Sequence, residues 1–205
     1  MTENLSDPAP LPNRAAGPDA VPADAAPQQQ YQVRLDWGIA GFQALAGGAD
    51  VVILVDALPA VAADLSLQTP LGVHRVVSCS LANRTAVAEW VLARQTETGQ
   101  RCSVAVIAVG ERRDDGTLRF AVEDSLAAGA VVDALSSLGL DHCSPEAAAA
   151  SVAFEGLARA VRHLVGACET GQLLLAQNRR AEVQALSAID TCTTVTELAH
   201  FAFPA

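Results

Sequence analysis

An uninterrupted apolar run, Val104–Val109, constrains the fold of this chain more than any other stretch. It lacks the alternation of polar and apolar residues found in a strand with one exposed face, so it predicts a strand buried on both faces. Gly110 ends the run, a charged loop follows, and an apolar stripe at helical spacing predicts a helix over Phe120–Leu138. Such a strand needs helices on both sides. We therefore predict an α/β fold with three layers, α/β/α, around a mostly parallel or mixed sheet.

Similar patterns predict further elements before and after this stretch. Gln32–Trp37 alternates like a half-buried strand, Val51–Val55 is a second fully apolar strand, and Val73–Ser78 is a third short one. Capping residues, glycines and prolines indicate where helices begin and end. Helices are predicted at Gly38–Ala46, Ala60–Leu67 and Leu81–Gln95, from Pro145 to Cys168 as one long helix, and as one or two shorter helices within Gly171–Leu186, with a short element near Val195–Phe201 covering the core.

Residues 1–30 differ in composition from the rest of the chain. They hold six of the ten prolines and four acidic residues, with almost no large apolar side chains. Such a segment cannot offset the entropy lost on ordering, so we predict a disordered tail over 1–30 and a single α/β domain over 31–205. The acidic start lacks the apolar core of a secretory signal, and no run reaches the ~20 apolar residues of a membrane span. These features favour a cytoplasmic protein with no membrane partner.

Charge and cysteine content argue against several classes of function. The formal net charge is −10 and no basic stripe is present, which argues against nucleic acid as a partner. A few local arginines can still bind a small anionic ligand that carries phosphate or sulfonate, because contact-range attraction outweighs a diffuse negative field. The five cysteines include no CxxC pair, so we expect reduced thiols rather than a disulfide framework or a zinc cluster.

Charged residues follow both of the fully apolar strands. Asp56 comes directly after Val51–Val55, and Glu111 and Arg112 come just after Val104–Val109. Ligands of open α/β sheets bind beyond the carboxyl ends of the strands, so Asp56 is a candidate metal ligand or nucleophile. A turn-capping role for Asp56, and a structural ion pair between Glu111 and Arg112, are the alternatives.

Two helix starts carry further candidates. Glu123 and Asp124 lie in the first turns of the helix over Phe120–Leu138, where they can hold Mg²⁺ or simply complement the helix N-terminus. Asn83 and Arg84 lie in the first turn of the helix over Leu81–Gln95, where they can assist phosphate binding or serve only as helix-surface residues. Arginines of the charged loop offer planar forks for phosphate or sulfonate oxygens.

Longer motifs around these residues resemble one known family. Three motifs are together similar to the signature of 2-phosphosulfolactate phosphatases: Gly110-Glu111-Arg112, Gly116-Thr117-Leu118-Arg119, and Glu123-Asp124 before Ala128-Gly129-Ala130. Further similar pieces, in the same order along the chain, are Gln32–Gly38, as in bacterial members, then Val51–Asp56, Cys79–Ala88 and Ser144-Pro145-Glu146. The resemblance covers most of residues 32–205.

This resemblance implies a Mg²⁺-dependent phosphatase that releases phosphate from 2-phospho-3-sulfolactate or a related small anionic monoester. Bound Mg²⁺ neutralises phosphoryl charge and orients an attacking group, which suits a site of carboxylates and arginines. The expected roles are catalysis for Asp56 and Glu111, Mg²⁺ ligation for Glu123 and Asp124, and anion binding for the remaining four: Arg112, Arg119, Asn83 and Arg84.

The segment after Asp56 is shorter than in the family that the chain resembles. Only residues 57–82 separate Asp56 from Asn83, Ala57–Val61 stands in place of a Thr-rich helix start, and a Ser-Pro-Asn-Gly element is missing. Those elements could donate hydrogen bonds to phosphate, and one such donor is worth roughly 3 kcal/mol. A catalytically inactive relative that binds a ligand or a protein partner is therefore a second hypothesis. A purely structural or homodimeric domain is a third.

Overall fold

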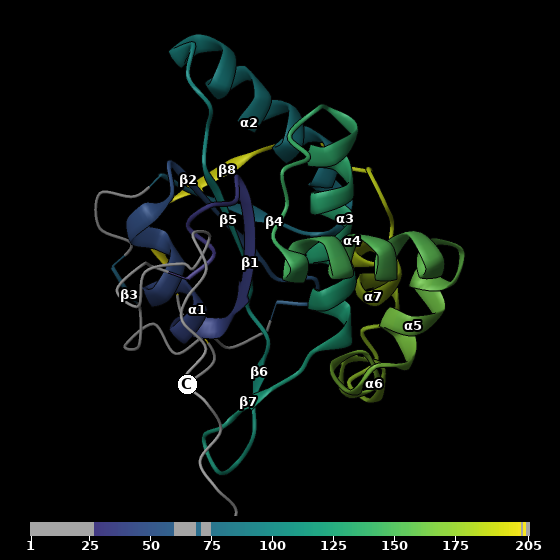
Figure 1. Ribbon diagram of the computed structural model, residues 1–205. Coiled ribbons are helices and arrows are strands. Elements are labelled where there is room, and N and C mark those ends of the chain that lie inside the picture. Colours follow the sequence, from purple (N-terminus) through teal and green to yellow (C-terminus); the bar gives the residue numbers. More distant parts are fainter. Residues whose placement is uncertain (1–26, 60–68, 71–74, 202, 204–205) are drawn as a thin grey trace, which may run out of the picture.

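The computed structural model describes residues 27–59, 69–70, 75–201 and 203. Within these residues the main sheet has five strands, and its order confirms the predicted α/β class (Figure 1). In spatial order the strands are β1 (Val33–Trp37), β5 (Val104–Ala108), β2 (Val51–Val55), β4 (Arg75–Cys79) and β8 (Thr196–Leu198). The first four run parallel, and β8 pairs antiparallel with β4 at the edge, so the sheet is mixed.

Short ladders and helices complete the described structure. β3 (Thr69–Pro70) pairs with β9 (His200–Phe201), and β6 (Glu111–Arg112) forms a hairpin with β7 (Leu118–Arg119). The α-helices are α1 (Gly38–Leu45), α2 (Arg84–Thr98), α3 (Val122–Ser137), α4 (Pro145–Leu157), α5 (Val161–Ala167), α6 (Glu169–Ala176) and α7 (Arg180–Leu186). Single 3-10 turns are η1 (Ala46–Gly48), η3 (Leu81–Asn83) and η4 (Ala158–Ala160).

Both faces of the sheet are covered, as the uninterrupted apolar run predicts. Val106 of β5 is fully buried in the larger core with residues of α2 and α3, and the next residue, Ile107, is fully buried in the smaller core with Phe42 and Leu45 of α1. Figure 1 shows α1 on one side of the sheet and α2, α3 and α4 on the other. The three-layer arrangement therefore places the carboxyl ends of β2 and β5 between two helical layers.

Several predicted elements are confirmed at their expected positions. The predicted strands over Gln32–Trp37, Val51–Val55 and Val73–Ser78 correspond to β1, β2 and β4. Ser80 caps the turn that leads into α2, and the Ser144 hydroxyl accepts a hydrogen bond from the Ala147 N–H at the start of α4. The helix predicted over Ala60–Leu67 lies outside the described residues.

One prediction about the helices is wrong. The pattern from Pro145 to Cys168 suggested one long helix, but the chain forms α4, η4 and α5 in succession, and α6 begins directly after Cys168. The Cys168 backbone is extended, with ψ 164, and its thiol sulfur accepts a hydrogen bond from the Gly171 N–H at 3.2 Å, which caps α6. Apolar periodicity is a local signal and does not report a change of helix direction.

The predicted tail lies almost entirely outside the described residues. Pro27–Gln30 form a turn, and the Gln28 side chain both donates to and accepts from the Leu35 backbone. These four residues are the last ones of the predicted tail, and the rest of the tail lies outside the described residues. Within the described part of the chain, no helix is long and apolar enough to cross a membrane.

Gly129 of α3 is expected to be essential to the packing of α3 on α4. A Cβ at this position would lie 2.1 Å from the Ala150 carbonyl oxygen of α4, which is backbone and cannot move aside cheaply. Gly129→Ala should lower the free energy of unfolding by about 2 kcal/mol or more. Urea denaturation followed by circular dichroism measures this change.

Gly156, near the end of α4, provides the matched control. A Cβ there would meet nothing within 4 Å. Gly156→Ala should therefore raise the free energy of unfolding by up to about 1 kcal/mol through helix propensity. Equal effects of the two substitutions would contradict the close approach of α3 and α4.

Candidate active site

The candidate site lies where two adjacent parallel strands end. Val55 of β2 lies opposite Ala108 of β5 in the sheet register, so the chain leaves both strands at the same edge. Asp56 follows β2 directly, and Glu111 opens the β6–β7 hairpin just beyond β5. Figure 1 shows this hairpin and the first turn of α3 at the same end of the molecule.

Asp124 ties α3 to the ends of both strands. One carboxylate oxygen accepts a hydrogen bond from the Ala57 N–H at 2.8 Å, and the other accepts one from the Gly110 N–H at 2.8 Å. The side chain is buried, and these two bonds satisfy backbone donors that the sheet ladder no longer serves. Asp124 thereby holds Asp56 and Glu111 beside the start of α3.

The carboxyl groups at this edge perturb one another. Burial, and then the neighbouring Glu111 carboxylate, raise the pKa of Asp56 to about 7. Burial, and then Asp56, raise the pKa of Asp124 well above its usual range. Burial also raises the pKa of Glu111, against the opposing effect of Arg119. The structure therefore brings together the four acids that the sequence singled out, and at least one of them changes protonation near neutral pH.

Glu123 is the most unusual of the four acids. Its side chain is about 2% exposed, yet neither carboxylate oxygen has a hydrogen-bond partner among the described residues. The nearest cation is Arg119, whose guanidinium nitrogen lies 4.0 Å from the Glu123 carboxylate. The neighbouring Cys168 thiol lies 3.0 Å from the Val165 carbonyl oxygen, to which it can donate a hydrogen bond. A buried carboxyl group without partners is costly, which suits a ligand-binding group.

Arg119 connects three elements around this carboxyl group. Besides its approach to Glu123 on α3, it donates a hydrogen bond to the Thr170 hydroxyl at 2.9 Å and lies 3.5 Å from the Glu169 carboxylate at the start of α6. Thr170 and Glu169 were not among the sequence candidates. No motif marks them, because they reach the site only through the turn that ends α5.

A closed metal cage is not formed by these acids. Among the described residues, no group of three or more His, Cys, Asp or Glu side chains is arranged to hold a metal ion. Mg²⁺, however, commonly takes only one or two protein carboxylates and completes its shell with water and phosphate oxygens. The unpartnered Glu123 oxygens, with Asp124 next in sequence, fit that simpler kind of site.

The remaining candidates lie in different surroundings. Arg112 is exposed, and its guanidinium lies close to Gly116 across the hairpin loop. Glu111 and Arg112 both line a cavity of about 260 Å³ between the hairpin and the start of α1.

Asn83 and Arg84 use their polar groups within the fold. The Asn83 side chain accepts a hydrogen bond from the Ser80 N–H at 2.9 Å and donates to the Thr194 carbonyl at 3.1 Å. Arg84 forms ion pairs with Asp133 at 2.8 Å and with Asp190 at 3.1 Å. These contacts agree with the alternative that Asn83 and Arg84 serve only the structure of the helix surface. The expected role of the two residues in anion binding stays a prediction.

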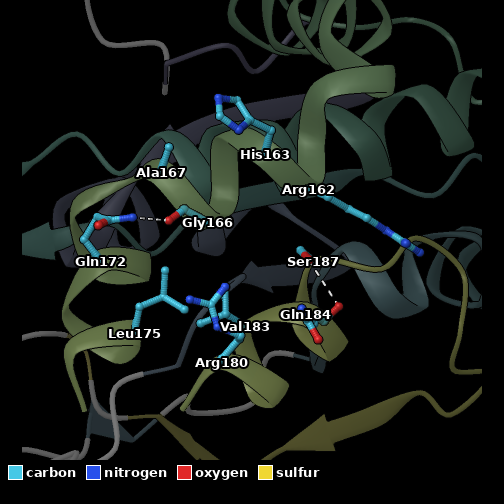
Figure 2. A pocket seen from close by; sticks show the side chains of 10 residues that line it. All are labelled: Arg162, His163, Gly166, Ala167, Gln172, Leu175, Arg180, Val183, Gln184 and Ser187. Carbon is cyan, nitrogen blue, oxygen red and sulfur yellow. Dashed lines mark hydrogen bonds between the residues drawn. The ribbon is translucent and has the colours of Figure 1, made fainter. Parts of the chain in front are cut away.

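A larger cavity, of about 520 Å³, lies among α5, α6 and α7 (Figure 2). Figure 2 shows the helices around it, with the Gln172 amide donating to the Gly166 carbonyl at 2.6 Å. Arg162, His163 and Arg180 line this cavity, and none of the eight site residues predicted from the sequence does. It is therefore separate from the edge where the acids gather.

Comparison with known proteins agrees with the motifs. The sequence model of a family described as 2-phosphosulpholactate phosphatase matches residues 65–200. The chain belongs to this family. The match includes Glu111, Arg119, Glu123 and Asp124, whereas Asp56 precedes it. No curated protein matches the chain.

The raised pKa of Asp56 predicts how stability depends on pH. Between about pH 4 and pH 7 the folded protein keeps a proton that the unfolded chain has released, so the contribution of Asp56 to stability falls as pH rises through this window. Asp56→Asn removes this dependence. The free energy of unfolding of the wild type, minus that of Asp56→Asn, should therefore fall between pH 4 and pH 7 and stay constant above pH 7.

Asp115, in the hairpin loop, gives a control of opposite sign. Hydrogen bonds from Thr117 lower the pKa of its carboxyl. The free energy of unfolding of the wild type, minus that of Asp115→Asn, should fall as the pH drops below the ordinary range of an Asp pKa. Urea titrations at a series of pH values measure both variants. A difference in free energy of unfolding between wild type and Asp56→Asn that stays constant from pH 4 to pH 7 would show that Asp56 is not in the crowded environment described here.

Proposed function

We propose that the protein is a Mg²⁺-dependent phosphatase that hydrolyses a small anionic phosphate monoester, as the name of its family suggests. The observation that carries the proposal is the buried carboxyl group of Glu123, which has no hydrogen-bond partner among the described residues, beside Arg119 and Asp56 at the carboxyl edge of the sheet. A buried acid, a neighbouring guanidinium and a second acid that titrates near pH 7 suit phosphoryl chemistry.

Each residue has a distinct part in this proposal. Glu123, supported by Asp124, would hold the cation, and Arg119, whose guanidinium lies 4.0 Å from Glu123, would bind a phosphoryl oxygen. As water forms its bond to phosphorus and the ester bond from phosphorus to the leaving oxygen breaks, Asp56 gives its proton to the leaving oxygen and Glu111 accepts a proton from the water. A carboxyl with a pKa of about 7 carries a proton in a useful fraction of molecules at neutral pH, which suits a general acid.

Mg²⁺, when bound, neutralises charge on the phosphoryl group and orients the reacting oxygens. The chain itself supplies rigidity. Asp124 is fixed by two backbone hydrogen bonds, and Arg119 is held against Thr170, so both groups keep their places before substrate arrives.

Glu123→Gln tests the proposal. The substitution keeps the size of the side chain but replaces one carboxylate oxygen with an amide nitrogen, which cannot bind a cation. Phosphate release from 2-phosphosulfolactate and from a panel of small phosphate monoesters, with Mg²⁺ or Mn²⁺, should fall at least about a hundredfold. Mg²⁺ should raise the melting temperature of the wild type and not that of the variant.

Glu155→Gln is the matched control, because Glu155 is an exposed residue of α4 and is not one of the candidate site residues. It should leave both turnover and the effect of Mg²⁺ unchanged. If the wild-type protein releases no phosphate from any ester of the panel with either metal, the proposed phosphatase function is rejected.

A catalytically inactive binding protein is the second candidate. Two observations favour it: Asn83 and Arg84 are engaged in contacts within the fold, and the acids form no group of three suited to a metal. In that case phosphate, sulfolactate or a divalent cation should raise the melting temperature although no ester is hydrolysed. No thermal response to any of these probes would remove this candidate as a binder of such ligands.

A further inference from the structure

The cavity of about 520 Å³ among α5, α6 and α7 differs in charge from the rest of the chain. Arg162 and Arg180 line it, and no Asp or Glu is among the described residues that do so. The whole sequence, by contrast, has 23 acidic and 13 basic residues. Charges in contact with a ligand outweigh a diffuse field of opposite sign, so this hollow suits an anion.

The acidic side chains of the surrounding helices are engaged elsewhere. Glu169, at the start of α6, lies 3.5 Å from the arginine of the candidate active site, and Glu182 of α7 pairs with Arg179. The guanidinium groups of Arg162 and Arg180 have no hydrogen-bond or ion-pair partner among the described residues. Their positive charge therefore remains available to a ligand in the cavity.

One of the two arginines points into the cavity. Figure 2 shows Arg180 directed from α7 toward α5, beside Leu175 and Val183, whereas Arg162 and His163 extend away from it. Arg180 is thus the cation that a ligand between the helices would contact, and Arg162 adds positive charge at one side. A guanidinium can donate two parallel hydrogen bonds to one carboxylate, so a single carboxylate matches Arg180 in both charge and geometry.

The cavity also has apolar walls and enough room for an organic group. Ala167, Leu175 and Val183 line it, and a Cβ added to Gly166, another lining residue, would meet nothing within 4 Å. Its volume of about 520 Å³ lies within the range of roughly 300–1,000 Å³ that is usual for small-molecule sites. An apolar hollow with one well-placed charged group is the common construction of such a site.

Close packing of α5 and α6 fixes the walls of the cavity. A Cβ at Gly171 of α6 would lie 2.1 Å from the Val165 carbonyl oxygen of α5, so the two backbones approach as closely as glycine permits. The Gln172 amide then donates to the Gly166 carbonyl at 2.6 Å, as Figure 2 shows. Val183 anchors α7 in the larger core. The hollow therefore exists before any ligand binds, which lowers the cost of binding.

We propose that the cavity among α5, α6 and α7 is a second ligand site, which binds a small organic carboxylate with an apolar body such as an aromatic ring system. The carboxylate pairs with Arg180, and the apolar body lies against Leu175 and Val183. The proposal does not depend on the phosphatase function, because none of the eight site residues predicted from the sequence lines this cavity. Binding here is expected whether or not the protein hydrolyses an ester.

The first measurement compares three probes by calorimetry with the full chain at low ionic strength. The probe 2-naphthoate has both a carboxylate and an apolar body, whereas acetate lacks the body and 2-naphthalenemethanol lacks the charge. Binding of 2-naphthoate should be at least about tenfold tighter than that of either other probe, because the charge-assisted hydrogen bonds and the buried hydrocarbon both contribute. Equal affinity of 2-naphthoate and either other probe, or no binding of 2-naphthoate, would overturn the proposal.

The second measurement locates the bound carboxylate. Arg180→Gln should weaken the binding of 2-naphthoate at least about tenfold and leave that of 2-naphthalenemethanol unchanged. Arg159→Gln is the matched control, because Arg159 is an exposed residue of η4 that does not line the cavity, and its substitution changes the net charge equally. It should leave the affinity for 2-naphthoate unchanged. Unchanged affinity in Arg180→Gln, or equal weakening by both substitutions, would overturn the proposal.

Discussion

The Asp124 carboxylate is the contact on which the candidate site depends. Its two oxygens accept the Ala57 and Gly110 N–H groups, one beyond each of two neighbouring strands. These donors lie where the parallel ladder has ended, in a region closed to solvent, and they need an acceptor there. The carboxylate also lies in the first turn of α3, where the helix N-terminus favours negative charge. One side chain thus sets the position of α3 relative to the sheet and, with it, the positions of Asp56, Glu111 and Glu123.

The same contact explains why the acids crowd together. Once Asp124 fixes α3, the residue before it, Glu123, is buried with no hydrogen-bond partner among the described residues, and Asp56 lies close enough to the other carboxyls for its pKa to rise to about 7. A fold selected for stability alone has little reason to keep two buried and two half-buried acids at one edge of the sheet. Arg119 offsets part of the cost, but at 4.0 Å it does not pair closely with Glu123. Such a cluster has the character of a binding site, which agrees with the membership of the chain in a phosphatase family.

The sequence predicted the strands of the sheet, and the acids at their carboxyl ends, better than it predicted contacts between side chains. Continuous apolar runs identified β2 and β5 as buried strands because burial on both faces removes alternation, and the positions of Asp56 and Glu111 followed from where those runs end. Periodicity says nothing about partners that are distant in the chain, and Arg84 pairs with Asp190, 106 residues away. Nor can a sequence distinguish an acid that accepts hydrogen bonds from backbone N–H groups from an acid that binds a metal ion. Asp124 and Glu123 are adjacent and both buried, yet only Asp124 has hydrogen-bond partners among the described residues.

The acids of the candidate site and several residues of the neighbouring cavity come from different parts of the chain. Glu111, Arg119 and Glu123 lie within the residues that match the family, so phosphate chemistry at this edge is what family membership leads one to expect. Several residues that line the cavity beside the β6–β7 hairpin, including Ile39 and Phe203, lie outside that match, before residue 65 or after residue 200. The hairpin connects the two, since Glu111 belongs to the acid edge and also lines this cavity together with Leu118. The part of the edge that the family match includes is therefore bordered by segments outside the match, and a function common to the family can be argued only from the residues within it.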